Sequence, residues 1–200
     1  MSLNLIITGV GGQGNVLASQ IIGNAALKRG FKVTIGETFG LSQRGGPVMS
    51  HIRLSRTRNF GPLIPPNMAN IIVGLEPLET IRILHEYGNK ETIFIVNSRP
   101  IYPLNVIAGD VEYPDIDWIR SVLDDSGQKL YWLDATPIAI ELGEPIILNM
   151  IMIGALCGLP DFPIEVKDFR EVIKNIFPES KLEANYKALE TGRGLINKTC

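Results

Sequence analysis

Six consecutive residues near the start of the sequence, Gly9–Gly14, have the types and spacing of a loop that holds an anion. They match the G-x-G-x-x-G pattern, between an apolar strand-like run and a segment with helical spacing, which is the context that the pattern requires. Glycine lets the backbone turn tightly and approach a bound group, and the free amides at the start of a helix favour a phosphate. The candidate binding residues of this loop are Gly9, Gly11, Gly12, Gln13 and Gly14.

An acidic residue, Glu37, follows this loop at the distance expected of a ribose-binding group. In dinucleotide sites such an acid lies about 20 residues beyond the glycines and binds a ribose hydroxyl. By pattern alone the loop and Glu37 would bind NAD or FAD, yet nothing in the loop identifies a dinucleotide in particular. The alternative is that the glycines only allow the strand and the helix to pack closely.

A second glycine-rich stretch, Gly40–Val48, carries a denser set of polar groups. Its candidate binding residues are Ser42, Gln43, Arg44, Gly45 and Gly46. A guanidinium binds phosphate or carboxylate through two parallel hydrogen bonds. We expect Arg53, on the strand that follows, to point to the same side. Such a loop suits an anionic group or the acidic surface of a partner, and the alternative is a turn with a solvated arginine.

Strands that alternate with helices must position these two loops. Short apolar runs predict strands at 3–8, 31–35, 48–54, 70–74, 92–97 and 129–134. Helical spacing predicts helices at 15–29, 76–87, 115–124, 136–142, 149–156, 166–177 and 179–190. The order predicts a three-layer α/β Rossmann-like sandwich with a mostly parallel sheet, beginning with a βαβ unit. We expect one domain over residues 1–200, in which the helices from about residue 164 could form an arm.

Composition excludes several classes of protein. The formal net charge is −2, so the chain lacks the basic excess of a nucleic-acid-binding protein. The longest apolar stretch is too short for a membrane span. The 2 cysteines cannot supply an iron–sulfur cluster or a disulfide framework, and Asp124 and Asp125 have no matching metal ligands. No signal peptide pattern opens the sequence, so we expect a cytoplasmic protein.

The two glycine motifs together resemble the gamma-type domain of pyruvate/2-oxoacid:ferredoxin oxidoreductases. The similarity extends over most of the chain and includes Glu76–Glu79, Ala139–Gly143, Asn149, Met150, Gly154–Leu156, Asn185 and Gly192. The resemblance implies an accessory subunit, inactive alone, of an enzyme that oxidatively decarboxylates a 2-oxoacid. Coenzyme A accepts the acyl group in that reaction, and ferredoxin accepts the electrons.

The resemblance also implies a division of cofactors between chains. Thiamine diphosphate and the iron–sulfur clusters would lie on a large catalytic partner, and ferredoxin would interact through the complex. Indolepyruvate is the preferred 2-oxoacid, with other oxoacids left open. Because both glycine loops suit an anion, we expect a coenzyme A contact, with its diphosphate near Arg44. Two rival interpretations remain: a free-standing NAD- or FAD-binding module, and a structural subunit in which the loops serve packing. The isolated chain could also form a homodimer.

His51 and Tyr102 are two further candidates for a functional role. His51 alternates with apolar neighbours on a predicted strand and shows no partner that would orient it as a base, so a structural role is favoured over catalysis. Tyr102 lies in an irregular stretch and could line a site or an interface.

Overall fold

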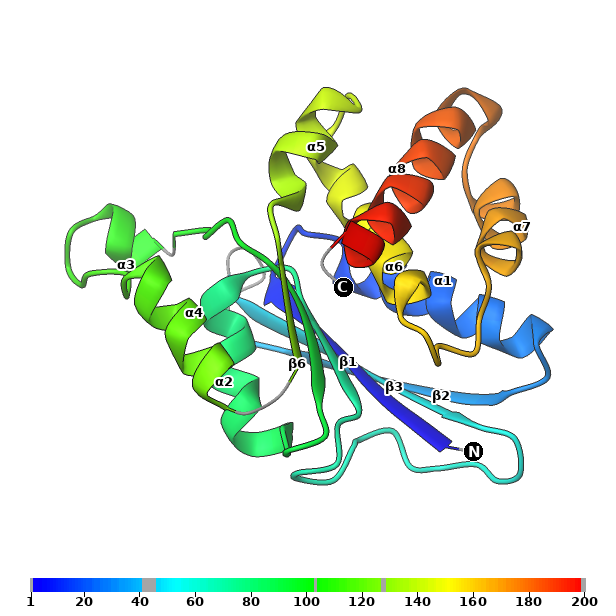
Figure 1. Ribbon diagram of the computed structural model, residues 1–200, viewed down its shortest axis with the longest axis horizontal. Coiled ribbons are helices and arrows are strands. Elements are labelled where there is room, and N and C mark those ends of the chain that lie inside the picture. The colour runs from blue at the N-terminus through cyan, green and yellow to red at the C-terminus, as the bar shows by residue number, and fades with distance from the viewer. Residues whose placement is uncertain (1, 41–45, 103, 127–128, 199–200) are drawn as a thin grey trace.

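The computed structural model describes residues 2–40, 46–102, 104–126 and 129–198, which form a mixed sheet between two layers of helices (Figure 1). The strands among these residues lie in the order β2-β3-β1-β4-β5-β6. Their bounds are β1 Ser2–Val10, β2 Lys32–Phe39, β3 Pro47–Ser55, β4 Ile71–Gly74, β5 Ile93–Asn97 and β6 Lys129–Leu133. Strand β3 is antiparallel to β1 and β2, whereas β1, β4, β5 and β6 run parallel. The predicted α/β sandwich with a mostly parallel sheet is confirmed.

The helices cover both faces of the sheet. Their bounds are α1 Asn15–Lys28, α2 Pro77–Tyr87, α3 Leu104–Ile107, α4 Ile116–Asp125, α5 Ala135–Glu141, α6 Leu148–Gly158, α7 Val166–Ile176 and α8 Glu179–Lys198. Alternate residues of β1 face opposite layers, because successive side chains of a strand point to opposite faces. Leu5 and Ile7 pack with α1, α6, α7 and α8, while Ile6 packs with α2 and α4. Among the described residues, no helix combines the length and apolar character needed to cross a membrane.

Strand β3 occupies a place that the sequence did not predict. The chain from β1 through α1 to β2 was expected to be a simple βαβ unit, but β3 lies between the two strands. The reason is burial: the second half of β3 is fully buried, including Ile52 and Leu54, whereas most of β2 is partly exposed. The more apolar strand takes the inner position, and β2 forms the edge.

Helices α6 and α8 pack unusually closely. A Cβ atom on Gly192 would lie 1.8 Å from the carbonyl oxygen of Ile151, and one on Gly154 would lie 2.0 Å from that of Leu189. Only glycine permits such an approach of two helical backbones. Helix α7 then packs against α1, so the C-terminal helices complete one face of the molecule (Figure 1).

Candidate functional site

A cavity of about 720 Å³ opens at the carboxyl ends of β1, β5 and β6. It is lined by Val10, Gly11, Gly12, Gln13, Asn97, Arg99, Ile101, Thr136, Ile140, Glu144, Pro145, Ile146 and Leu148. The carboxyl ends of parallel strands are the usual place for a ligand in an open α/β sheet. The first glycine loop therefore lies where a binding loop should lie, and it forms one wall of this cavity.

The glycines of that loop do different things. A Cβ atom on Gly9 would lie 2.4 Å from Gln13 Oε1, and one on Gly14 would lie 2.6 Å from Asn149 Nδ2. Gly12 has φ +104° and open space around it. Close packing thus explains Gly9 and Gly14, while Gly12 allows the turn that faces the cavity.

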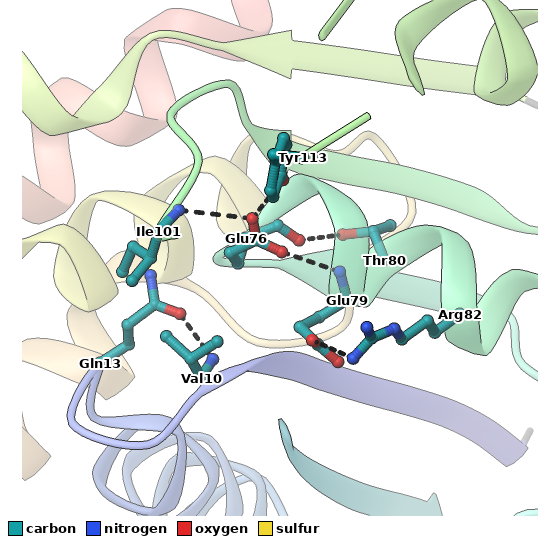
Figure 2. Close-up of polar contacts among 8 residues, drawn as sticks. All are labelled: Val10, Gln13, Glu76, Glu79, Thr80, Arg82, Ile101 and Tyr113. Carbon is teal, nitrogen blue, oxygen red and sulfur yellow. Dashed lines mark hydrogen bonds and ion pairs between the residues drawn. The ribbon is translucent and has the colours of Figure 1, made fainter. Parts of the chain in front are cut away.

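The Gln13 side chain fills the gap between β1 and β4. Its Oε1 accepts a hydrogen bond from the Val10 amide at 2.8 Å (Figure 2). Its Nε2 donates one to the Leu75 carbonyl at 2.9 Å. Gln13 is 9% exposed. In a dinucleotide fold the pyrophosphate approaches the first glycine turn at this crevice. Here the amide of Gln13 occupies the crevice and ties the two strand ends together.

Helix α1 begins at the loop without a side-chain cap. Its N-cap residue, Gly14, has φ +83°. Two buried polar atoms beside the loop, Asn15 Oδ1 and Asn149 Nδ2, have no hydrogen-bond partner among the described residues. Uncapped helix amides favour an anion, whereas the unpaired Asn15 Oδ1 is itself an acceptor and favours a donor. Anion binding by this loop stays a prediction.

Glu37 lies on β2 and is held by two serines. Ser19 Oγ donates to its Oε1 at 2.7 Å, and Ser50 Oγ donates to its Oε2 at 2.5 Å. Because β3 separates β2 from β1, Glu37 is one strand further from the glycine loop than the ribose-binding acid of a dinucleotide fold. Its carboxylate joins α1 to the β2–β3 pair.

Arg53 lies at the other end of the sheet from the glycine loop. It pairs with Asn4 in the β1–β3 register, whereas the loop follows Val10, which pairs with Pro47. Its guanidinium donates to the Asn4 side chain and to the carbonyls of Gly61 and Leu63. Arg53 therefore does not share a side with the cavity, and it anchors the loop that follows β3.

The second glycine stretch reaches the first. The Gly11 amide donates to the Gly46 carbonyl at 2.9 Å, and the Gly40 amide donates to the Pro47 carbonyl. Ser42, Gln43, Arg44 and Gly45 lie outside the described residues. Gly46, near the end of the stretch, therefore lies beside Gly11.

A buried carboxyl group, Glu76, lies directly after β4 and caps α2 (Figure 2). Its Oε2 accepts from the Glu79 amide at 2.8 Å, and its Oε1 accepts from Tyr113 Oη at 2.5 Å and from the Ile101 amide at 3.4 Å. Glu76 is 1% exposed, and burial raises its pKa above the ordinary value, although the hydrogen bonds oppose this shift. Burial likewise raises the pKa of Glu79, which pairs with Arg82.

The cavity includes residues that sequence reasoning missed. Asn97 ends β5 and bridges two segments: its Nδ2 donates to the Leu75 carbonyl, and its Oδ1 accepts from the Ala135 amide. Arg99 is exposed and has no carboxylate partner among the described residues. Their position could have identified them: Asn97 ends a predicted strand and Arg99 follows it, and ligand-binding residues gather at strand carboxyl ends.

His51 is fully buried and lies away from the cavity. Its Nδ1 accepts from the Ile64 amide at 3.4 Å, and its ring meets that of Tyr87 edge-on. Burial lowers the pKa of His51. These contacts favour the structural role over catalysis. Among the described residues, His, Cys, Asp and Glu side chains nowhere gather in threes as metal ligands would.

Comparisons with known proteins place the chain in a family and show relatives with the same fold. The model of the pyruvate ferredoxin/flavodoxin oxidoreductase family matches residues 4–195. The chain is 37% identical to the indolepyruvate oxidoreductase subunit IorB of Thermococcus kodakarensis over 190 residues, which is 94% of this chain and 93% of the relative.

Two solved structures share the fold. The pyruvate oxidoreductase subunit PORC of Thermotoga maritima is 23% identical and has a TM-score of 0.73, with 96% of each chain covered. The 2-oxoglutarate:ferredoxin oxidoreductase of Magnetococcus marinus, solved with 2-oxoglutarate, coenzyme A and succinyl-CoA bound, is 22% identical with a TM-score of 0.76. That match covers 98% of this chain and 31% of the Magnetococcus chain. The resemblance drawn from the two glycine motifs is confirmed, and the chain belongs to the pyruvate ferredoxin/flavodoxin oxidoreductase family.

Proposed function

We propose that the chain is the accessory subunit of an indolepyruvate:ferredoxin oxidoreductase and contacts coenzyme A at the cavity beside Gly9–Gly14. The enzyme would convert an aryl 2-oxoacid and coenzyme A into an acyl-CoA and carbon dioxide, with two electrons passed to ferredoxin. The observation that carries the proposal is the 37% identity with an indolepyruvate oxidoreductase subunit over nearly the whole of both chains.

The catalytic cofactors belong, in this proposal, to a large partner subunit. A cluster of the ferredoxin type needs four cysteine thiolates, and this chain has 2 cysteines. Cys157 stands as a free thiol whose pKa burial raises to about 12, which disfavours the thiolate that a metal needs. We therefore assign no step of thiamine or iron–sulfur chemistry to this chain. We also propose that the complex lies in the cytoplasm.

Coenzyme A suits the chemistry of the cavity. Ile101, Ile140 and Ile146 provide an apolar wall, and Asn97 and Thr136 provide polar groups at the strand ends. Arg99 contributes a positive charge without a carboxylate partner in the described part of the chain. Arg44 lies in the adjoining glycine stretch, outside the described residues. Glu144, the carboxylate among the described lining residues, is paired with Lys181. Apolar walls with a few polar groups and a cation fit a ligand that combines a pantetheine arm with phosphates.

Reconstitution of the two subunits tests the proposal. The purified chain, alone and mixed with its large subunit, would be assayed for reduction of a viologen dye that depends on indolepyruvate and coenzyme A. We expect activity only in the mixture. Arg44→Ala and Arg99→Ala should raise the KM for coenzyme A without changing the KM for indolepyruvate.

A parallel NADH fluorescence titration of the isolated chain separates the rival interpretation. We expect no saturable binding, because Gln13 fills the crevice between β1 and β4 and two serines engage Glu37. Saturable NADH binding without stimulation of the large subunit would contradict the accessory role and support a dinucleotide-binding module. An unchanged KM for coenzyme A and unchanged turnover in Arg44→Ala and Arg99→Ala would instead favour a purely structural subunit.

A further inference from the structure

The connection between β5 and α4 lines part of the cavity, and residues that do not line the cavity hold it in place. We call residues 98–102 and 104–113 the strap. Arg99 and Ile101, near its start, line the cavity. Tyr113, at its end, points back toward the start of α2 (Figure 2). The strap thus leaves the carboxyl end of β5 at the cavity and ends in the helix layer that contains α2 and α4 (Figure 1).

One carboxylate oxygen holds both ends of the strap. Glu76 Oε1 accepts from the Ile101 amide and from Tyr113 Oη, while Oε2 of the same group caps α2 through the Glu79 amide. A helix cap needs one acceptor, and a short exposed side chain supplies it at little cost. Burying a carboxylate is unfavourable unless hydrogen bonds compensate. The hydrogen bonds from Tyr113 and Ile101 thus give Glu76 acceptor roles that a helix cap alone does not require.

Two apolar side chains in the described middle of the strap contribute little packing. Ile107 is 69% exposed and Val111 is 48% exposed, so these apolar side chains do not hold the segment against the molecule. The rings of Tyr102 and Tyr113 meet edge-on at 5.2 Å, which joins the two ends to each other. The contacts at its ends help to hold the strap, and Arg99 lies only two residues from the Ile101 amide that Glu76 holds.

We propose that Glu76 and Tyr113 are positioning residues that hold the strap so that Arg99 and Ile101 face a ligand in the cavity. The inference deepens the proposed function and rests on it, since the ligand is taken to be coenzyme A. Neither residue lines the cavity among the described residues, so each acts through the strap and not by contact with the ligand.

Tyr113→Phe in the complete enzyme complex provides the test. The change removes the hydroxyl that donates to Glu76 and keeps the ring that meets Tyr102. We expect the KM for coenzyme A to rise about tenfold, the effect of losing one hydrogen bond to a charged group. The kcat and the KM for indolepyruvate should stay within about twofold of wild type, because the other substrate does not contact the strap. Hydrogen exchange of amides 99–113 should accelerate.

Two further variants complete the design. Tyr186→Phe is the matched control: its hydroxyl donates to the Arg170 carbonyl on the exposed side of α8, and both readouts should stay unchanged. Glu76→Gln keeps an acceptor for Tyr113 and should raise the KM for coenzyme A less than Tyr113→Phe does. This order of effects separates positioning from a general loss of folding.

The outcomes distinguish the inference from the function on which it rests. If Arg99→Ala raises the KM for coenzyme A but Tyr113→Phe does not, the cavity binds coenzyme A and the positioning role is overturned. If neither changes that KM while exchange in Tyr113→Phe accelerates, the strap is held as described and the coenzyme A contact is overturned, and positioning for that ligand with it. If hydrogen exchange of the strap is unchanged in Tyr113→Phe, the Tyr113 hydroxyl does not hold the strap, whatever the kinetic constants are.

Discussion

The cavity and the α6–α8 pair both depend on glycine, but for opposite physical reasons. At the cavity, Gly12 has φ +104° and no atom within 4 Å of the position of a Cβ. Between the helices, Gly192 is tightly enclosed, and a Cβ would overlap the Ile151 carbonyl. The first glycine allows a backbone conformation, while the second allows two backbones to touch. The recognisable motif therefore contains the more tolerant glycine, and the less conspicuous position is the more constrained.

Gly192→Ala should have the largest effect on stability. Overpacking of a core costs about 1–3 kcal/mol, and the contact with a backbone carbonyl cannot relax by a side-chain rotation, so we expect about 3 kcal/mol. Urea denaturation would measure it. Gly194→Ala is the matched control on the same helix: its Cβ position is open, and the higher helix propensity of alanine should stabilise by about 0.5–1 kcal/mol. Similar losses in both variants would show that the close packing of α6 on α8 is not the cause.

Gln13→Ala should have the next largest effect. The change removes two buried hydrogen bonds and leaves the Val10 amide unpaired, for which we expect a loss of about 2 kcal/mol. Gln20→Ala, at an exposed position of α1, should change the free energy of unfolding by less than about 0.5 kcal/mol. A Gln13→Ala protein as stable as Gln20→Ala would mean that the crevice between β1 and β4 is not closed by this side chain.

Gly12→Ala should cost less than either change. Only the backbone conformation opposes the new methyl group, and a left-handed conformation costs about 1 kcal/mol for alanine. Thermal and urea unfolding would both report it. A loss as large as that of Gly192→Ala would contradict the contrast between the two regions.

The pH dependence of stability should report on the buried carboxyl of Glu76, which caps α2 and lies in neither of the two regions. Because burial raises its pKa, this carboxyl contributes stability below pH 4.5, its ordinary pKa, and that contribution is lost as the pH rises through the raised value. Glu76→Gln removes this loss. The stability of wild type relative to Glu76→Gln should therefore fall as the pH rises above 4.5, as urea midpoints would show. Burial, and to a smaller extent the charge of Glu76, also raises the pKa of Glu79. The contribution of Glu79 to stability therefore falls with rising pH as well. Parallel pH profiles would argue against the burial of a charge at this site.

The sequence predicted the positions of helices and strands along the chain better than it predicted which strands are neighbours in the sheet. The spacing of apolar residues located the strands and most helices to within a few residues, because burial on one face imposes a period on the chain. The same pattern could not reveal that β3 enters between β1 and β2, since strand order depends on contacts between distant segments. The position of Arg53 was missed for a related reason: the strand was predicted, but its register with β1 was not.

The candidate site was predicted in part. Of the candidate binding residues, Gly11, Gly12 and Gln13 line the cavity and Gly46 lies beside Gly11, while their role in binding stays a prediction. Arg99 and Ile101 were not identified, because they lie in a stretch with no regular pattern and reach the cavity only through the fold of the strap. Glu76 was noted as part of the family resemblance, yet its link to Tyr113 joins residues 37 positions apart, which periodicity cannot detect.

The placement of β3 also constrains the order in which the chain can assemble. One edge of β1 stays unpaired until residues up to Ser55 exist, because that edge belongs to β3 in the finished sheet. The first 36 residues therefore cannot complete their own sheet, although they contain a strand, a helix and a second strand. During synthesis the β2–β3 hairpin must form or dock before this edge is protected from other chains.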